Sequence, residues 1–167
     1  LTVSVANNGS STISSYTATC TDGTTQYTGT SSTSWITVSG LTNGVSYSCS
    51  VTATNAAGTS ASSASSPPVT LATLPEAPTI DSIAAGDGQA VITFTPGDDN
   101  GSPITGYIGA CFGDSVFFAS SATSPITVSG LTNGESYVCA VRAINDVGAG
   151  PAAVTEPVTP VAPPPGC

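Results

Sequence analysis

The nine-residue phrase ITVSGLTNG occupies residues 36–44 and recurs unchanged at residues 126–134. A repeat with a period of about 90 residues is typical of a chain built from successive copies of one structural unit. The length of 167 residues accommodates two such units, so we expect two tandem domains. We place the first domain at residues 1–74, the second at residues 75–160, and a Pro-rich tail or linker at residues 161–167.

Several segments alternate apolar with hydroxyl residues. The clearest are LTVSV (1–5), YTATC (16–20), ITVSG (36–40) and YSCSVTAT (47–54). Strict alternation predicts strands with one buried and one solvated face. Asn-Gly and Asp-Gly turn signals separate these segments, and none has a helical period, so the expected fold class is all-β. For the Ser/Thr-rich residues 10–34, the alternation favours a sheet with an uncharged surface over a disordered stalk.

The charge balance excludes several classes of partner. Arg142 is the only basic residue, against ten acidic residues, which gives a formal net charge of −9. Binding to a nucleic-acid backbone or to an anionic membrane surface relies on several Lys or Arg residues. No apolar stretch approaches the roughly 20 residues of a membrane-spanning helix. We therefore expect no nucleic-acid partner and no membrane insertion.

The phrases ITVSGLTNGVSYSCSVTATNAAGTS (36–60) and ITVSGLTNGESYVCAVRAINDVGAG (126–150) resemble fibronectin type III domains. The shared features are a Gly-Leu before a turn, a Tyr, and alternating small residues that end in Ala-x-Asn-x-x-Gly. The resemblance covers nearly the whole chain, twice over. It implies two tandem immunoglobulin-like β-sandwiches from a secreted or surface repeat protein of microbial origin.

The same resemblance assigns a structural role to two tyrosines. Leu41 with Tyr47, and Leu131 with Tyr137, fall on the positions of the family's tyrosine corner. There the phenol hydroxyl bonds to nearby backbone. The alternative, a catalytic tyrosine, lacks a base beside it.

The first copy departs from the family at its start. The second copy has a first strand in PTIDSIAAG (78–86), whereas the first copy begins directly at LTVSV, so its N-terminal strand A is absent. The family's strand-B tryptophan is replaced by Val5 and by Phe94, which predicts a small core. An absent strand leaves an unpaired edge. Either the sequence is a piece cut from a longer product, or a neighbouring chain supplies the strand.

Four cysteines repeat with the units, and the resemblance suggests how they pair. Alternation turns all four inward, and the family's strands C and F, on which they fall, are neighbours in one sheet. We therefore predict the disulfides Cys20–Cys49 and Cys111–Cys139. A zinc site fits poorly because the sequence has no CxxC pair and no His. Persistent disulfides imply an extracellular, secreted or cell-surface location.

The fifth cysteine, Cys167, follows a Pro-rich run at the end of the sequence. We interpret it as a thiol that pairs with another chain, pairs with sequence beyond this segment, or stays free.

No motif for catalysis is present. The sequence contains no His and no Lys, and its carboxylates fall mostly in turns or linkers. GDDNGS (97–102) lacks the ligand spacing of a calcium loop and fits a turn. Asn8 and Asn100 each begin an Asn-Gly-Ser sequon within a turn. We expect no enzyme activity, no cofactor and no metal site.

Three aromatic residues are candidates for a contact surface. Alternation points Trp35 outward, where its ring is able to stack on a sugar, anchor a neighbouring subunit or cover its own sheet edge. Phe117 and Phe118 are adjacent in a strand, so one of them is expected at the surface.

These observations favour a non-enzymatic structural or adhesive repeat module of a surface protein or fibre. A filament subunit assembled by strand exchange is one form of this role. Its expected partners are other copies or neighbouring modules, with glycans or cell-surface proteins as further candidates. The alternative is a carbohydrate-binding or spacer module of a secreted polysaccharide-degrading enzyme.

Overall fold

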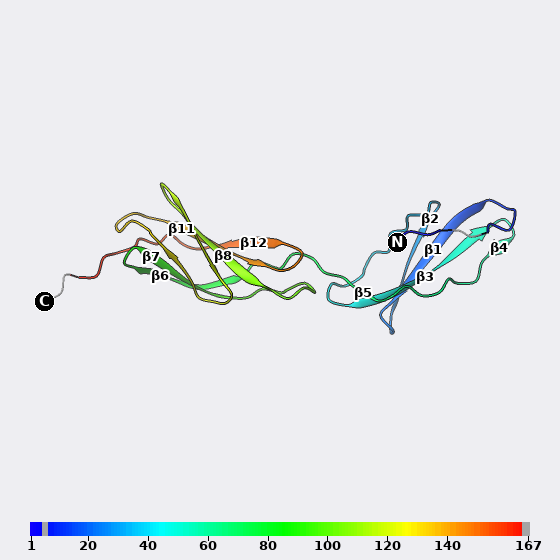
Figure 1. Cartoon of the computed structure of the whole chain (residues 1–167), viewed down its shortest axis with the longest axis horizontal. Coiled ribbons are helices and arrows are strands. Elements are labelled where there is room, and N and C mark those ends of the chain that lie inside the picture. The colour runs from blue at the N-terminus through cyan, green and yellow to red at the C-terminus, as the bar shows by residue number, and fades with distance from the viewer. Residues whose placement is uncertain (5–6, 165–167) are drawn as a thin grey trace. The chain divides into compact units, whose positions relative to one another are not determined.

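The alternating segments form antiparallel sheets in the computed structural model, which describes residues 1–4 and 7–164 (Figure 1). The chain divides into a first unit, Leu1–Leu71, and a second unit, Ala72–Cys167. The described residues form strands and turns only, which confirms the predicted all-β class. Among them, none belongs to a helix long and apolar enough to cross a membrane.

The first unit contains one well-formed sheet, with strand order β2–β1–β3–β4 and with β5 paired to the start of β3. Its strands are β1 (Ile13–Thr21), β2 (Gln26–Ser31), β3 (Ser46–Asn55), β4 (Gly58–Thr59) and β5 (Val69–Thr70). The two long central strands pair in a register that places Ala18 opposite Val51 and Cys20 opposite Cys49. Because alternate residues face the same side, the cysteines and these small apolar residues share the inner face.

The second layer of the first unit is much shorter than expected. The strands predicted at residues 1–5 and 36–40 are reduced to a single bridge, Thr2 opposite Trp35. Beside it, Leu1 and Ile36 exchange two hydrogen bonds of 3.1 Å each. A two-stranded ribbon with no third strand beside it is marginally stable, which explains why the ladder stops early.

This pairing also corrects the alignment of the two units. Leu1 pairs with Ile36 as Ile92 pairs with Ile126, so the counterpart of Phe94 is Val3. The residue assigned to that position from the sequence, Val5, lies outside the described residues.

The second unit forms both sheets of a sandwich. One sheet has the order β10–β7–β6 and the other β12–β11–β8–β9. The strands are β6 (Thr79–Gly86), β7 (Gln89–Thr95), β8 (Gly106–Phe112), β9 (Val116–Ser121), β10 (Ile126–Ser129), β11 (Val138–Ile144) and β12 (Ala149–Val154). The segment ITVS is therefore a strand at residues 126–129, although the same letters at 36–39 are not.

Inward residues of both sheets build one continuous core in the second unit. Its buried members are Ala90, Ile92, Phe94, Tyr107, Cys111, Ile126, Val128, Leu131, Tyr137, Cys139, Val141, Ala143 and Val158. From the edge strand β6, Ile80 and Ile83 pack against this core. The first unit buries far fewer of the corresponding side chains.

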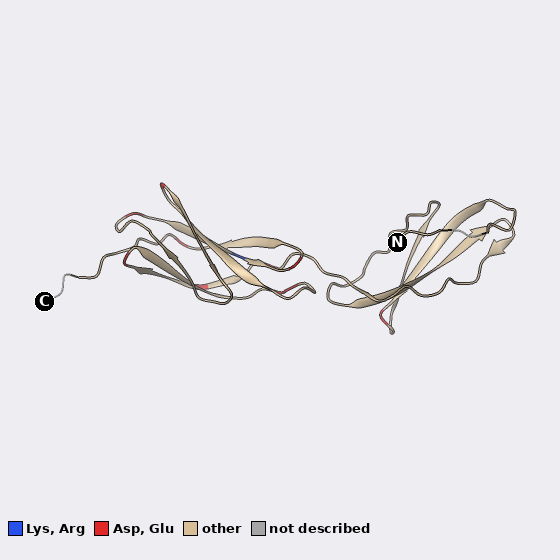
Figure 2. Ribbon diagram, in the orientation of Figure 1, with Lys and Arg blue, Asp and Glu red and all other residues tan. Residues whose placement is uncertain are grey.

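Charged side chains are distributed unevenly between the units. Asp22 is the only charged side chain in residues 1–71, and all others belong to the second unit. Most carboxylates lie in turns and loops at the ends of the strands (Figure 2). The sheets of the first unit consequently present an uncharged surface of Ser and Thr hydroxyls.

Candidate functional site

Each unit has one disulfide that joins two adjacent strands. Cys20 in β1 and Cys49 in β3 are directly opposed, with a Cα–Cα distance of 4.0 Å. Cys111 in β8 and Cys139 in β11 are opposed in the same way and at the same distance. Both cross-links therefore lie within a sheet and not across the sandwich. Cys167 lies outside the described residues.

The surroundings of the two disulfides differ. Cys111 and Cys139 are fully buried. Cys20 is also buried, but Cys49 is only half-buried. The sulfur pair of the first unit is therefore the one that solvent approaches.

The corner tyrosines make the same backbone contact in both units. The hydroxyl of Tyr47 accepts a hydrogen bond from the Thr42 backbone N–H at 3.0 Å, and that of Tyr137 accepts one from Thr132 at 3.1 Å. The Tyr137 hydroxyl also donates to the Glu135 carboxylate at 2.9 Å. In both units the hydroxyl therefore ties the tyrosine to the backbone of the turn that precedes it.

The leucines that precede these corners differ in burial. Leu131 is buried in the core of the second unit, whereas Leu41 is half-buried. Because both residues are leucines, their difference in burial arises from the side chains that pack over them.

The three aromatic residues singled out from the sequence fall into two groups. Trp35 is 72% exposed and Phe118 is 71% exposed, each on its own unit. Phe117 instead turns inward and packs edge-to-face on Tyr137, with ring centroids 5.9 Å apart. Phe117 therefore belongs to the interior of the second unit and is not part of a contact surface.

The acidic side chains of the described residues were compared with the requirements of a metal site. Among residues 1–4 and 7–164, no three His, Cys, Asp or Glu side chains gather as a metal site. In the loop at residues 97–102, the carboxylates of Asp98 and Asp99 accept hydrogen bonds from the backbone N–H groups of Asn100 and Gly101. These carboxylates stabilise a turn.

Three pKa shifts have local structural causes. The Thr25 and Thr24 backbone N–H groups donate to the Asp22 carboxylate at 2.8 Å, and they lower the pKa of Asp22. Burial raises the pKa of Tyr107 and is the largest cause of the raised pKa of Tyr27. All three shifts move the pKa away from neutrality.

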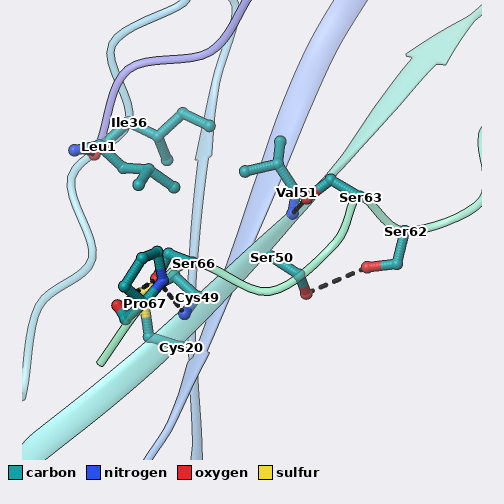
Figure 3. Close-up of a disulfide and its surroundings, with 10 residues drawn as sticks. All are labelled: Leu1, Cys20, Ile36, Cys49, Ser50, Val51, Ser62, Ser63, Ser66 and Pro67. Carbon is teal, nitrogen blue, oxygen red and sulfur yellow. Dashed lines mark hydrogen bonds between the residues drawn. A yellow bond between two sulfur atoms is a disulfide. The ribbon is translucent and has the colours of Figure 1, made fainter. Parts of the chain in front are cut away.

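A row of three serines covers the outer edge of β3, and the sequence analysis missed it. Ser60, Ser63 and Ser66 each donate a backbone N–H to a carbonyl of β3 and accept a β3 backbone N–H on the side-chain oxygen. We call these three residues the serine ladder. Figure 3 shows two of its bonds, from Val51 to Ser63 and from Cys49 to Ser66.

The serine ladder spans an edge that lacks charges. Strand edges are commonly protected by charged residues or proline, but Asp22 is the only charged side chain of this unit, and its prolines, Pro67 and Pro68, come only after the last serine of the ladder. Each serine hydroxyl accepts a hydrogen bond that a backbone carbonyl would accept in a regular sheet. The backbone N–H groups of every second residue of β3 are therefore paired with serines at every third position. The signal in the sequence is a Ser at every third position from 60 to 66.

The inner face of the first unit contains an apolar groove of about 380 Å³. Besides the Cys20–Cys49 disulfide, its main lining residues are Leu1, Ile36, Val38, Leu41, Val69 and Leu71. Figure 3 shows Leu1 and Ile36 side by side, with the disulfide in the same view. The counterparts of several lining residues are buried in the core of the second unit, so the two units differ in packing at this groove.

Comparisons with known proteins agree with this architecture. The family model for the fibronectin type III domain matches residues 1–69. A crystal structure of a stretch of titin domains is 20% identical, with a TM-score of 0.54, and the match covers 87% of this chain and 54% of that one. At this identity the likeness concerns the fold alone.

Two further structures have lower TM-scores. The FN1–FN3 domains of chicken CNTN1 are 18% identical over 93% of this chain and 59% of that one, with a TM-score of 0.47. The twitchin kinase region from C. elegans is 28% identical over 53% of this chain and 17% of that one, with a TM-score of 0.46. The chain thus spans less than two thirds of each of these solved chains. Residues 1–69 are similar to the fibronectin type III domain, and the fold of the whole chain is that of tandem immunoglobulin-like β-sandwiches.

Proposed function

We propose that this chain is a non-enzymatic, extracellular structural or adhesive segment of a surface protein or fibre. The observation that carries the proposal is the disulfide between adjacent strands in each unit. Such bonds persist mainly in oxidising compartments. The hydroxyl-rich surface and the scarcity of charge in the first unit suit an interaction that is insensitive to salt.

The disulfides are positioned to limit extension under load. Each one joins residues 29 or 28 positions apart, so the segment between them stays closed when the surrounding strands separate. A closed segment of 29 residues withholds about 100 Å of length, at about 3.4 Å per residue. A unit pulled apart from its ends therefore unfolds only partly.

Single-molecule force extension tests this role. We expect each unfolding event of the oxidised chain to lengthen by about 100 Å once a reductant is added. The matched control is the double variant Cys20→Ser with Cys49→Ser, in which the first unit gives the longer step without reductant. Equal steps before and after reduction would show that the disulfides do not bear on extension, and would remove the basis of the proposal.

Assembly through strand exchange belongs to the same proposal. The first unit has the incomplete second layer, and its groove supports a role as the acceptor of a strand from a neighbouring copy or module. In that arrangement the partners are other chains of the same repeat type, and the second unit serves as a closed spacer.

The exposed Trp35 supports an alternative function, a carbohydrate-binding or spacer module of a secreted polysaccharide-degrading enzyme. An exposed indole with uncharged surroundings is suited to stacking on a sugar ring. The chain contains one Trp, so fluorescence excited selectively at tryptophan, and not at the five tyrosines, reports on this position alone.

A glycan titration separates the two functions. Saturable quenching of the Trp35 fluorescence by an oligosaccharide favours the alternative. Loss of binding in Trp35→Ala, with retention in the equally exposed control Phe118→Ala, places the ligand on the indole. If no glycan in a panel quenches the Trp35 fluorescence, the result favours the structural role.

A further inference from the structure

The four-stranded sheet of the second unit has an apolar outer face. In this sheet Phe112 lies opposite both Val116 and Val138, and the next row joins Phe118 through two alanines to Val154. Residues that are directly opposed, or two apart in one strand, point to the same side of a sheet. All five of these large side chains are exposed. We call Phe112, Val116, Phe118, Val138 and Val154 the apolar face.

The first unit shows that the sandwich does not need apolar residues at these positions. The disulfides align the two sheets, because Cys20 and Cys49 are opposed as Cys111 and Cys139 are. In place of Phe112, Val116, Phe118 and Val138, the first unit has Thr21, Gln26, Thr28 and Ser48. The same sheet therefore forms with polar side chains on its outer face. Contiguous exposed apolar side chains that the fold does not require are typical of an interaction surface.

The distribution of charge favours a second copy of the chain as the partner. Nine of the ten acidic residues belong to the second unit, yet β8, β9, β11 and β12 contain none of them. Arg142 in β11 is the only charged residue in these four strands. Two chains with a net charge of −9 repel each other least where carboxylates are absent. Aromatic residues and Arg, with few acidic residues, are also the composition of the core of a protein interface.

The charges at the two ends of the apolar face are complementary. Arg142 lies opposite Ile108, one row beyond Phe118. Asp114 is exposed in the turn between Phe112 and Val116, at the other end of the same strands. A two-fold axis that crosses the strands between the rows of Phe118 and Phe112 brings Arg142 of each copy towards Asp114 of the other. The same axis places Phe118 over the row of Phe112 in the second copy.

We propose that the apolar face is a homotypic adhesion surface, through which the second units of two copies of this chain pack face to face. The two sheets lie about 10 Å apart, as in other sheet-on-sheet packings. The aromatic side chains fill the centre of the contact, and the pairs of Arg142 with Asp114 fix its orientation at the rim. This proposal names a partner for the adhesive form of the proposed function and rests on it.

The size of the face predicts a weak contact. Three rows across four strands cover about 400 Å², from the spacing of strands and of alternate residues. This is about half of the area that each partner contributes to a stable interface. We therefore expect rapid, reversible dimerisation at high concentration. Several such units in one protein would strengthen the contact by multivalency.

Sedimentation velocity of the full oxidised chain, up to millimolar concentration, tests the surface. We expect a monomer–dimer equilibrium that Phe112→Thr with Phe118→Thr weakens at least tenfold. Threonine is the residue of the first unit at both positions, so this variant should fold. The control is Val161→Thr, which removes apolar surface at a 57% exposed residue outside the sheet and should leave dimerisation unchanged. A chain that is monomeric throughout, or a phenylalanine variant that dimerises as the unaltered chain does, would overturn the proposal.

Charge exchange tests the two-fold arrangement. Asp114→Arg makes the chain less negative, yet it should weaken dimerisation because it places two cations together at each end of the face. Adding Arg142→Asp to the same chain should restore the contact. Stronger dimerisation of the single variant Asp114→Arg would show that net charge alone governs association, and the arrangement would be wrong.

NMR spectra of the unaltered chain at increasing concentration locate the contact without any substitution. Amide shifts that depend on concentration should be confined to β8, β9, β11 and β12. Shifts centred on β6, β7 and β10, or on the first unit, would place the contact elsewhere and contradict the proposal. None of these results affects the force-extension test, which addresses the role of the disulfides alone.

Discussion

Val69 and Val158 occupy the same position in the two units, each paired with a corner tyrosine, yet Val69 is 58% exposed and Val158 only 8%. The segment next to Val158 is bound to the end of β6, where the Val161 N–H donates to the Gly86 carbonyl at 3.2 Å. Val69 faces the apolar groove instead. One covering strand therefore accounts for the difference between two otherwise similar units.

The difference in burial predicts an order of reduction. Cys49 is half-buried and lines the groove, whereas Cys111 and Cys139 are fully buried. Because a reductant must reach a sulfur atom, the Cys20–Cys49 bond should open first under native conditions. Graded reduction followed by alkylation and mass mapping measures this order. Simultaneous opening of both bonds would mean that the groove is not accessible.

The serine ladder predicts a specific loss of stability. The Ser66 hydroxyl accepts the Cys49 N–H at 3.0 Å and donates to the Pro67 carbonyl at 3.0 Å. Ser66→Ala removes both contacts at a half-buried edge, so we expect the first unit to lose about 1 kcal/mol of unfolding free energy.

Ser65→Ala is the control for this measurement, because Ser65 is exposed and neighbours Ser66 in the same segment. In denaturant titrations, the free energy of unfolding of the first unit should be lower for Ser66→Ala than for Ser65→Ala by about 1 kcal/mol. If both variants had the same free energy of unfolding, the hydrogen bonds of the Ser66 hydroxyl would contribute no more to stability than hydrogen bonds to water.

Acid should destabilise the turn that contains Asp22. The pKa of this carboxyl is lowered in the folded state by the Thr25 and Thr24 N–H groups, so its stabilising contribution is present above the ordinary value of 3.8. The contribution is lost as pH falls below that value through the folded-state pKa. Residue-resolved NMR should show the Thr24 and Thr25 amide signals shifting in that range.

Asp22→Asn is the matching control for the acid experiment. It removes the titrating group of this turn, so the amide shifts should disappear. Since Asp22 is the only charged side chain in residues 1–71, no other carboxyl of the first unit contributes. An unshifted titration at the ordinary aspartate pKa would contradict the hydrogen bonding described above.

Much of this architecture is legible in the sequence because it depends on periodicity. The repeated phrase indicates two units, and alternation places Cys20 and Cys49 on an inner face, where β1 and β3 oppose them. These features need only the order of residues along each strand.

Other features depend on neighbours that are distant in the sequence. The identical letters ITVS form β10 at residues 126–129 but no strand at 36–39, because the sheet that would hold them is incomplete in the first unit. The serine ladder could not be predicted from the sequence, because a three-residue spacing is not the period of a strand or of an amphipathic helix. Its role depends on hydrogen bonds to β3, which lies beside it only in the folded unit.

The most direct test of the central claim, that the first unit has an open inner face and the second a closed one, is amide hydrogen exchange measured on the intact chain. Protection should be lower along β3 than along β11, its counterpart, because partial burial lowers the free energy of local opening. Equal protection of β3 and β11 would contradict the open face, and with it the acceptor groove.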